Sequence, residues 1–115
     1  MTQPATSVSA PANNGTDTGP VSAAPCMRRM FFTGAVLMGI AVALGAFGAH
    51  GLRNHTDAYG LATWETAVRY QAWHALGLLI FAAVWDRFSS RLLRAAAICM
   101  VIGTFIFSGS LYVLV

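Results

Sequence analysis

Met30–Leu52, MFFTGAVLMGIAVALGAFGAHGL, is the stretch that decides the fold of this chain. Its first twenty residues, up to Ala49, carry no formal charge. As a helix with a rise of about 1.5 Å per residue they span about 30 Å, the thickness of the hydrocarbon core of a bilayer. We therefore predict a membrane-spanning helix over about residues 30–50. Its Gly- and Ala-rich end allows another helix to approach closely and leaves His50 at a membrane surface.

The composition of the whole chain agrees with a membrane protein. Of the 115 residues, 57% are hydrophobic and 10% are charged, whereas about 25% of an ordinary soluble domain is charged. The length allows one small helical bundle and no second domain. Seven arginines and no lysine give a net charge of +3; they lie at the ends of apolar runs, which fits orientation in a membrane better than nucleic-acid binding. Cys26 and Cys99 have no paired spacing and predict neither a disulfide framework nor a metal or other cofactor.

Two further apolar stretches predict two further spans. Thr63 is a good N-cap, and Glu65 lies in the first turn, where the helix dipole favours a negative charge, so a second helix is expected over about residues 63–85. The last 21 residues are again without formal charge, which predicts a third helix over about residues 93–115. The fold class is therefore an all-α membrane protein with three transmembrane helices in a small bundle.

Residues 1–27 are expected to form a disordered tail ahead of the transmembrane domain, residues 28–115. The tail carries a single charge, Asp17, and no periodic apolar face, so it cannot bury enough surface to offset the entropy lost on ordering. The pair Arg28-Arg29 ahead of an apolar run also resembles an export signal. We favour a cytoplasmic helix anchor, because a run of about twenty residues exceeds the roughly 7 to 15 of a signal sequence.

The arginines also predict the orientation of the helices. Arg28 and Arg29 lie on one side of the membrane together with the three arginines of the second loop, while Arg53 and Arg69 lie on the other side. Because positive residues favour the cytoplasmic side, the N-terminus and the second loop are predicted in the cytoplasm, and the first loop and the C-terminus outside. Aromatic residues near the ends of the spans, Trp64 among them, match interfacial belts.

In this topology the polar residues of the spans fall toward the outer leaflet, where the first helix ends, the second begins and the third ends. Ser108 lies about 20 Å into the third helix, in a row with Thr104 and Tyr112 at i, i+4 and i+8. We therefore predict one polar interhelical cluster, made of His50, Gln71, His74, Ser108 and Ser110.

Three motifs also match a known family. They are GAFGAHGL at residues 45–52, YQAWHAL at residues 70–76 and FSGSLY at residues 107–112. All three resemble, in the same order, the signatures of the family named domain of unknown function 423, or transmembrane protein 256. The resemblance covers about residues 30–115 and implies a small integral membrane protein of the bacterial inner membrane. It implies no catalytic activity and no active-site residues, and it argues against cleavage of the first helix as a signal.

This sequence departs from the family pattern at its C-terminal end. Family members usually continue past the FSGSLY-type segment into a fourth spanning helix that opens with a Pro-Gly-Gly-like turn, whereas this sequence stops at Val115. We expect either a shortened member or a third helix that finds a partner elsewhere. A three-helix bundle leaves faces of the first and third helices available for association.

Three functions remain open from the sequence. The favoured one is a structural or interaction protein without enzyme activity, whose partners are the lipid bilayer and other membrane proteins or a second copy. An alternative is a metal- or proton-handling protein that uses His50 and His74, because imidazole titrates near neutral pH. A remote alternative is an intramembrane serine hydrolase with Ser108 or Ser110 beside a histidine, although the sequence has no recognisable nucleophile elbow.

Overall fold

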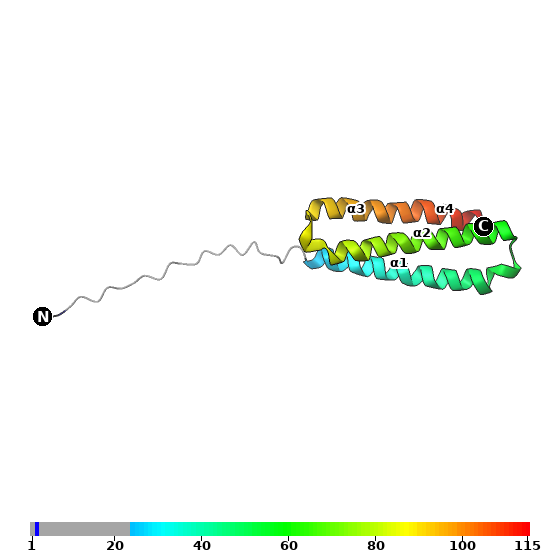
Figure 1. Ribbon diagram of the computed structural model, residues 1–115, viewed down its shortest axis with the longest axis horizontal. Coiled ribbons are helices and arrows are strands. Elements are labelled where there is room, and N and C mark those ends of the chain that lie inside the picture. The colour runs from blue at the N-terminus through cyan, green and yellow to red at the C-terminus, as the bar shows by residue number, and fades with distance from the viewer. Residues whose placement is uncertain (1, 3–23) are drawn as a thin grey trace.

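The computed structural model describes residue 2 and residues 24–115. The expected disordered tail, residues 1–27, therefore lies outside the described residues except at residue 2 and at its last four positions. From Ala24 onward the described chain forms three long helical rods that lie side by side, with no strand among them (Figure 1). This part of the fold is all-helical, as predicted.

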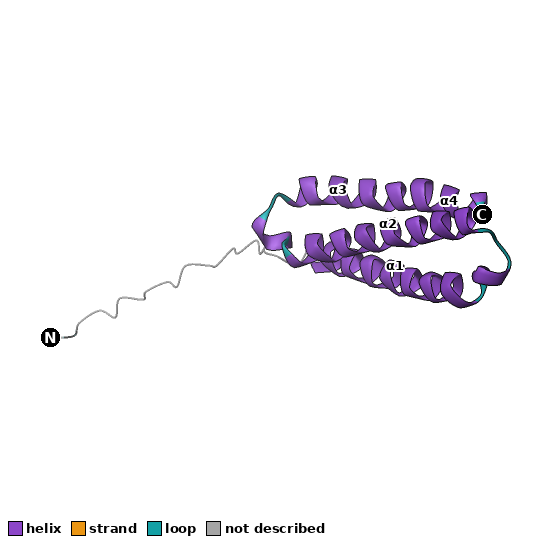
Figure 2. Ribbon diagram, turned by 45° about the vertical axis from the view of Figure 1, so that its right-hand side comes forward, coloured by secondary structure: helices purple, strands orange, loops and turns teal. Residues whose placement is uncertain are grey.

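The rods run in alternating directions and are joined by two short loops (Figure 2). The elements in chain order are α1 (Ala24–His50), a 3-10 turn (Leu52–Asn54), α2 (Ala58–Ala83), a second 3-10 turn (Trp85–Arg87), α3 (Ser90–Gly103), the π-helical turn η4 (Thr104–Ser108) and α4 (Gly109–Leu114). Helix α3 continues through η4 into α4 as one rod, which we call the third rod. The start of α1 and the second loop lie at one end of the bundle, and the first loop and the C-terminus lie at the other (Figure 1).

The second helix begins five residues earlier than predicted. Its N-cap is Asp57, whose carboxylate accepts a hydrogen bond from the Gly60 backbone N–H at 2.8 Å. Thr63 lies inside the helix, where its hydroxyl donates to the Tyr59 carbonyl oxygen at 2.9 Å. The predicted start at Thr63 is therefore wrong, because Asp is a stronger N-cap than Thr. The earlier start moves the polar residues of α2 about 7.5 Å farther from its beginning.

Two of the three rods are long and apolar enough to cross a membrane by length and composition. They comprise Pro25–Asn54 and Ser90–Leu114. Helix α2 has 26 residues and is also long enough, but it does not reach the same hydropathy, because Arg69, Gln71 and His74 interrupt its apolar residues. The predicted first and third spans are thus supported by composition, and the predicted middle span is not.

Helices α1 and α2 approach closely because glycines of α1 face α2. A Cβ added at Gly34 would lie 3.0 Å from the Ala75 carbonyl oxygen and 3.0 Å from Leu79 Cγ. A Cβ added at Gly48 would lie 2.6 Å from Cδ1 of Trp64. A side chain at either position would force the neighbouring atoms to shift, so glycine fits this separation best. Gly48 lies in the Gly- and Ala-rich end of α1, where close approach of a second helix is predicted.

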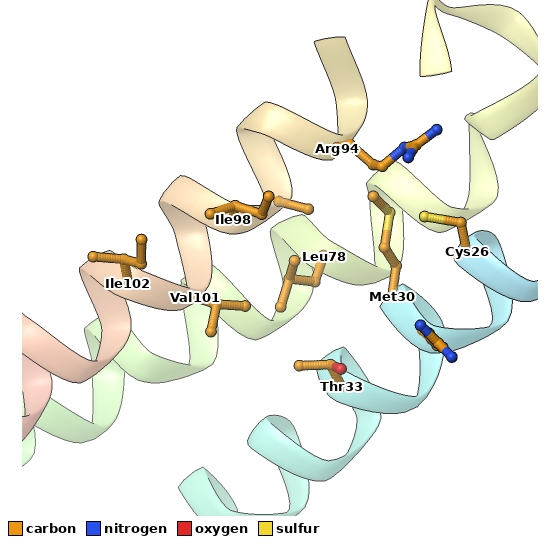
Figure 3. Close-up of a pocket in the computed structure, with 10 residues that line it drawn as sticks. Cys26, Met30, Thr33, Leu78, Arg94, Ile98, Val101 and Ile102 are labelled. Atoms are coloured by element: carbon orange, nitrogen blue, oxygen red, sulfur yellow. The ribbon is translucent and has the colours of Figure 1, made fainter. Parts of the chain in front are cut away.

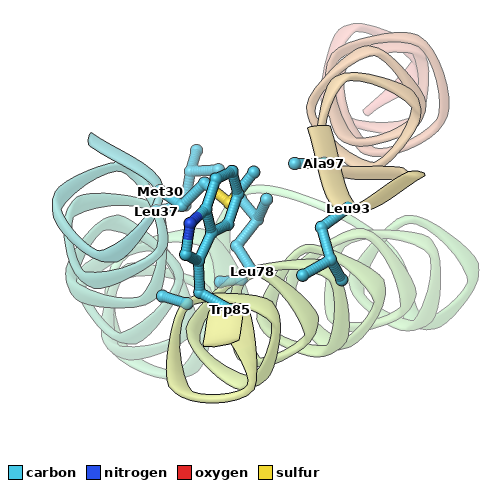
Figure 4. Close-up of a cluster of buried hydrophobic side chains, with 8 residues drawn as sticks. Met30, Leu37, Leu78, Trp85, Leu93 and Ala97 are labelled. Carbon is cyan, nitrogen blue, oxygen red and sulfur yellow. The ribbon is translucent and has the colours of Figure 1, made fainter. Parts of the chain in front are cut away.

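Helix α2 packs on both of its neighbours, whereas α1 and the third rod make few direct contacts with each other. Viewed along the bundle, the buried side chains of Met30, Trp85 and Leu93 lie between α1 and α3 (Figure 4). The bundle is therefore open along one side, between α1 and the third rod.

The buried apolar side chains gather toward the end of the bundle where α1 begins. Trp85, only 4% exposed, lies among side chains from all three rods (Figure 4). The full cluster comprises Met30, Leu37, Ala75, Leu78, Ala82, Trp85, Leu93 and Ala97. Outward-facing apolar side chains are exposed instead, with Ile106 at 68% and Val113 at 88%. Soluble monomers rarely expose large apolar side chains on this scale, so the exterior suits lipid.

Candidate functional site

Gln71 is the polar residue at which the three rods meet. Its side chain is buried, with 4% of the residue exposed. The amide Nε2 donates to the Leu37 carbonyl oxygen of α1 at 3.0 Å. The Tyr112 hydroxyl of α4 donates to the amide Oε1 at 2.9 Å. One side chain of α2 therefore holds both neighbouring rods.

Trp64 adds a second polar connection nearer the first loop. Its indole Nε1–H donates to the Leu44 carbonyl oxygen of α1 at 2.9 Å. Its ring also packs against Tyr112, with centroids 4.7 Å apart, and against Phe47, with centroids 5.7 Å apart. Trp64 and Tyr112 thus bring α1, α2 and α4 together in one contact.

The π-helical turn η4 presents two buried hydroxyl side chains. The Thr104 hydroxyl donates to the Met100 carbonyl oxygen at 2.9 Å. Ser108 is 1% exposed, and its Oγ has no hydrogen-bond partner within the described part of the chain. A single π-helical turn is a common feature of functional sites, and here it coincides with the unsatisfied hydroxyl.

A cavity of about 250 Å³ opens beside these groups. The predicted row of Thr104, Ser108 and Tyr112 faces it together with Gln71. The remaining lining residues are Leu37, Ile40, Leu44, Phe105 and Gly109. The structure therefore brings Gln71 and Ser108 of the predicted cluster together, with Tyr112 as a third member.

The two histidines lie far from each other. His74 is next to Ala75, which contacts Gly34 of α1. Gly34 precedes His50 by sixteen residues on the same helix, or about 24 Å. His50 is exposed at the end of α1. The His74 ring forms its hydrogen bond within α2, where Nδ1–H donates to the Tyr70 carbonyl oxygen at 2.6 Å.

The remaining predicted member, Ser110, also bonds within its own rod. Its hydroxyl donates to the Phe107 carbonyl oxygen at 2.8 Å, and the residue is exposed. The structure thus does not bring His50, His74 and Ser110 to the cavity that Gln71 and Ser108 line. His74 lies far from the level of His50 because it comes sixteen residues after Ala58, or about 24 Å into α2. The early start of α2 accounts for about 7.5 Å of this distance.

The geometry bears on the metal and hydrolase alternatives. Across the described residues, no group of three or more His, Cys, Asp or Glu side chains is placed to hold a metal ion. His50 and His74 are too far apart to bind the same metal ion, since metal–nitrogen bonds are only about 2 Å long. The Ser108 hydroxyl has neither histidine as a hydrogen-bond partner, which a serine nucleophile and its base require.

The contacts of Trp64 and Leu37 could not be read from side-chain patterns. The Trp64 indole donates to the backbone carbonyl of Leu44, and the Gln71 amide donates to the backbone carbonyl of Leu37. Every residue has a backbone carbonyl, so the sequence does not indicate which one is the acceptor. The available signal was Gly48, a residue without a side chain at the position where the Trp64 ring packs. From sequence Trp64 is interpreted as an interfacial aromatic residue.

These features define a small all-helical membrane protein whose rods are joined by buried polar side chains. The chain belongs to the family described as Protein of unknown function (DUF423), which matches residues 44–115. The family predicted from the three motifs is thereby confirmed.

Relatives from several bacteria agree with this assignment. The UPF0382 membrane protein YwdK of Bacillus subtilis is 42% identical over 89 residues, which are 76% of this chain and 72% of that protein. A UPF0382 membrane protein of Staphylococcus saprophyticus is 40% identical over 88 residues, 76% of this chain and 72% of the relative. The UPF0382 inner membrane protein YgdD of Escherichia coli is 39% identical over 87 residues, 76% of this chain and 66% of the relative. No solved structure matches the chain.

Proposed function

We propose that this protein is a structural or interaction component of the bacterial inner membrane, which crosses the bilayer three times and has no enzyme activity of its own. The observation that carries the proposal is the Gln71 amide, which holds α1 at the Leu37 carbonyl and the third rod at the Tyr112 hydroxyl. Polar side chains that are satisfied between helices determine which helix faces meet inside a bilayer. Gln71 and Tyr112, whose hydrogen bonds join different rods, therefore serve assembly of the bundle.

Helix α2 is the proposed middle span in spite of its polar residues. Its 26 residues correspond to about 39 Å, which exceeds the roughly 30 Å of hydrocarbon. The Gln71 amide is satisfied between two neighbouring rods, so the lipid does not have to solvate it. Arg69 lies on the half of α2 nearer the first loop, and its long side chain extends toward that membrane surface.

The third rod supplies the proposed surface for protein partners. Its outward side chains are large, apolar and exposed, with Ile106 at 68% and Val113 at 88%. In a bilayer, the association of helices depends on van der Waals packing and interhelical hydrogen bonds, because lipid is as apolar as the side chains. The partner is another membrane protein or a second copy of this chain.

Photocrosslinking in native membranes tests the interaction role. A photoreactive amino acid at Ile106 should yield an adduct with one discrete protein of defined mass. The matched control is the same amino acid at Tyr59, an exposed aromatic position beside the first loop, which should yield no discrete protein adduct. Lipid adducts alone at Ile106 would contradict the proposal.

The purified protein distinguishes the two alternative functions. Stoichiometric bound metal that is lost in both His50→Ala and His74→Ala would favour metal handling. Labelling of Ser108 or Ser110 by a fluorophosphonate probe would favour a hydrolase. Either result would contradict the assembly role proposed for the polar site.

A further inference from the structure

A mostly apolar groove made of adjoining pockets runs along the open side of the bundle, between α1 and the third rod. Three adjoining pockets form it. The first pocket shares Thr33 with the second, and the second shares Leu37, Ile40 and Phe105 with the third. We call the space lined by these three pockets the α1–α3 groove.

Two arginines lie at one end of the α1–α3 groove. Arg29 of α1 and Arg94 of α3 line the first pocket, a space of about 330 Å³ whose other lining residues are mostly apolar. Figure 3 shows Arg94 close to Cys26 and Met30 at this end, while the apolar side chains of α3 continue along the groove. Asp86 is the one acidic residue of the described chain at this end of the bundle, and it does not line the pocket.

We propose that the α1–α3 groove binds an anionic phospholipid, with its phosphate at Arg29 and Arg94 and one acyl chain along the groove. Guanidinium groups bind phosphate oxygens through paired, charge-assisted hydrogen bonds. Both arginines lie near the first turns of their rods, and in the proposed topology this end of the bundle lies at the cytoplasmic membrane surface, beside the lipid headgroups. Basic pockets between membrane-spanning helices are suited to anionic headgroups.

The length of the groove fits an acyl chain. Along α1 it extends from Arg29 to Leu44, fifteen residues or about 22 Å. One leaflet contributes about 15 Å to the hydrocarbon core, which is half of its thickness. The groove is therefore long enough to hold the full length of an acyl chain whose headgroup is at the arginines. This binding site goes beyond the proposed function and does not depend on which protein contacts the third rod.

Two neighbouring arginines provide a matched control. Arg28 precedes Arg29 in α1, and Arg91 lies about one turn before Arg94 in α3, but neither lines the groove. Arg28 lines a different pocket, between α1 and α2. Replacing either pair removes two positive charges from the same end of the same two helices, so only the position of the charge differs.

The test measures lipid retained by the full chain. The protein is purified in micelles that contain equal amounts of phosphatidylglycerol and phosphatidylcholine, and bound lipid is counted by native mass spectrometry. We expect the unaltered chain to retain phosphatidylglycerol preferentially. Arg29→Gln/Arg94→Gln should lower that retention about tenfold or more, since the loss of a hydrogen bond to a charged group has this effect on affinity. Arg28→Gln/Arg91→Gln should leave it unchanged, and Thr33→Phe, which fills the groove without changing charge, should lower it.

Three outcomes would overturn the proposal. Equal losses in the two arginine pairs would mean that general surface charge attracts the lipid. A dimer mass without bound lipid would mean that a second copy occupies the groove. If circular dichroism shows that Arg29→Gln/Arg94→Gln does not fold, Thr33→Phe decides, and unchanged retention of phosphatidylglycerol in that variant overturns the proposal.

Discussion

At the scale of single residues, Gln71 has the widest influence on the bundle. Its amide contacts the Leu37 backbone on one side and the Tyr112 hydroxyl on the other. Interhelical hydrogen bonds in membranes average only about 0.6 kcal/mol, because the separated helices also find partners. The main contribution of Gln71 is therefore to select which faces of α1, α2 and α4 meet.

Removal of this amide should cost modest stability. Gln71→Ala loses both hydrogen bonds, and we expect the free energy of unfolding in detergent to fall by about 1–2 kcal/mol. Tyr112→Phe loses one of them and should cost about 0.6 kcal/mol. Because the two residues share a bond, the double variant should lose less than the sum of the single losses. Denaturant unfolding followed by circular dichroism measures all three variants, and strictly additive losses would show that the bond is not formed.

The candidate site could be predicted only in part at this scale. Gln71, Ser108 and Tyr112 stand out in sequence because polar side chains are uncommon in apolar spans and must face the interior. The depth of His50 and His74 could not be predicted, because it depends on where α2 begins and on the register of α1 against α2. That register is determined by packing at Gly34 and Gly48, which no spacing of polar residues reveals.

At the scale of elements, the contact between α1 and α2 depends on glycines at particular positions. Gly34→Ala would place a Cβ 3.0 Å from the Ala75 backbone oxygen, and backbone cannot move as a flexible side chain does. We expect this variant to lower the free energy of unfolding by about 1–3 kcal/mol, the usual cost of overpacking. The control is Gly39→Ala on the same helix, where nothing lies within 4 Å of the added Cβ. Its better helix propensity should leave stability unchanged or raise it by up to about 1 kcal/mol. Equal losses in the two variants would argue against the close contact.

Helix existence could be predicted more readily than helix boundaries. The charge-free run from Met30 and the charge-free C-terminal stretch indicate rods by length alone. The start of α2 could have been placed at Asp57 by N-cap preference, since Asp is preferred over Thr there and its carboxylate accepts the hydrogen bond of the Gly60 N–H. The π-helical turn η4 has no distinct composition, since its residues would also fit an ordinary α-helix.

At the scale of the whole molecule, the distribution of arginines predicts the orientation in the inner membrane. Alkaline phosphatase, which is active only outside the cytoplasm, should be active when fused after Asn54 or Val115 and inactive when fused after Phe88. The positive-inside rule gives this pattern, because Arg28, Arg29 and the second-loop arginines outnumber those at the other end. Activity of the Phe88 fusion alone would show that the orientation is the opposite of the predicted one. Equal activity after Phe88 and Val115 would show that the third rod does not cross the membrane.

The open side of the bundle has a mechanical consequence. Helix α2 packs on both neighbours while these make few contacts with each other, so the three rods resemble a ribbon folded along α2 more than a closed cylinder. The buried cluster around Trp85 takes side chains from all three rods, so the angle between α1 and the third rod is set by their separate packing on α2 and by this shared cluster. A rod longer than the local hydrocarbon thickness tilts in the bilayer, so the thickness of the membrane takes part in setting how the protein lies in it.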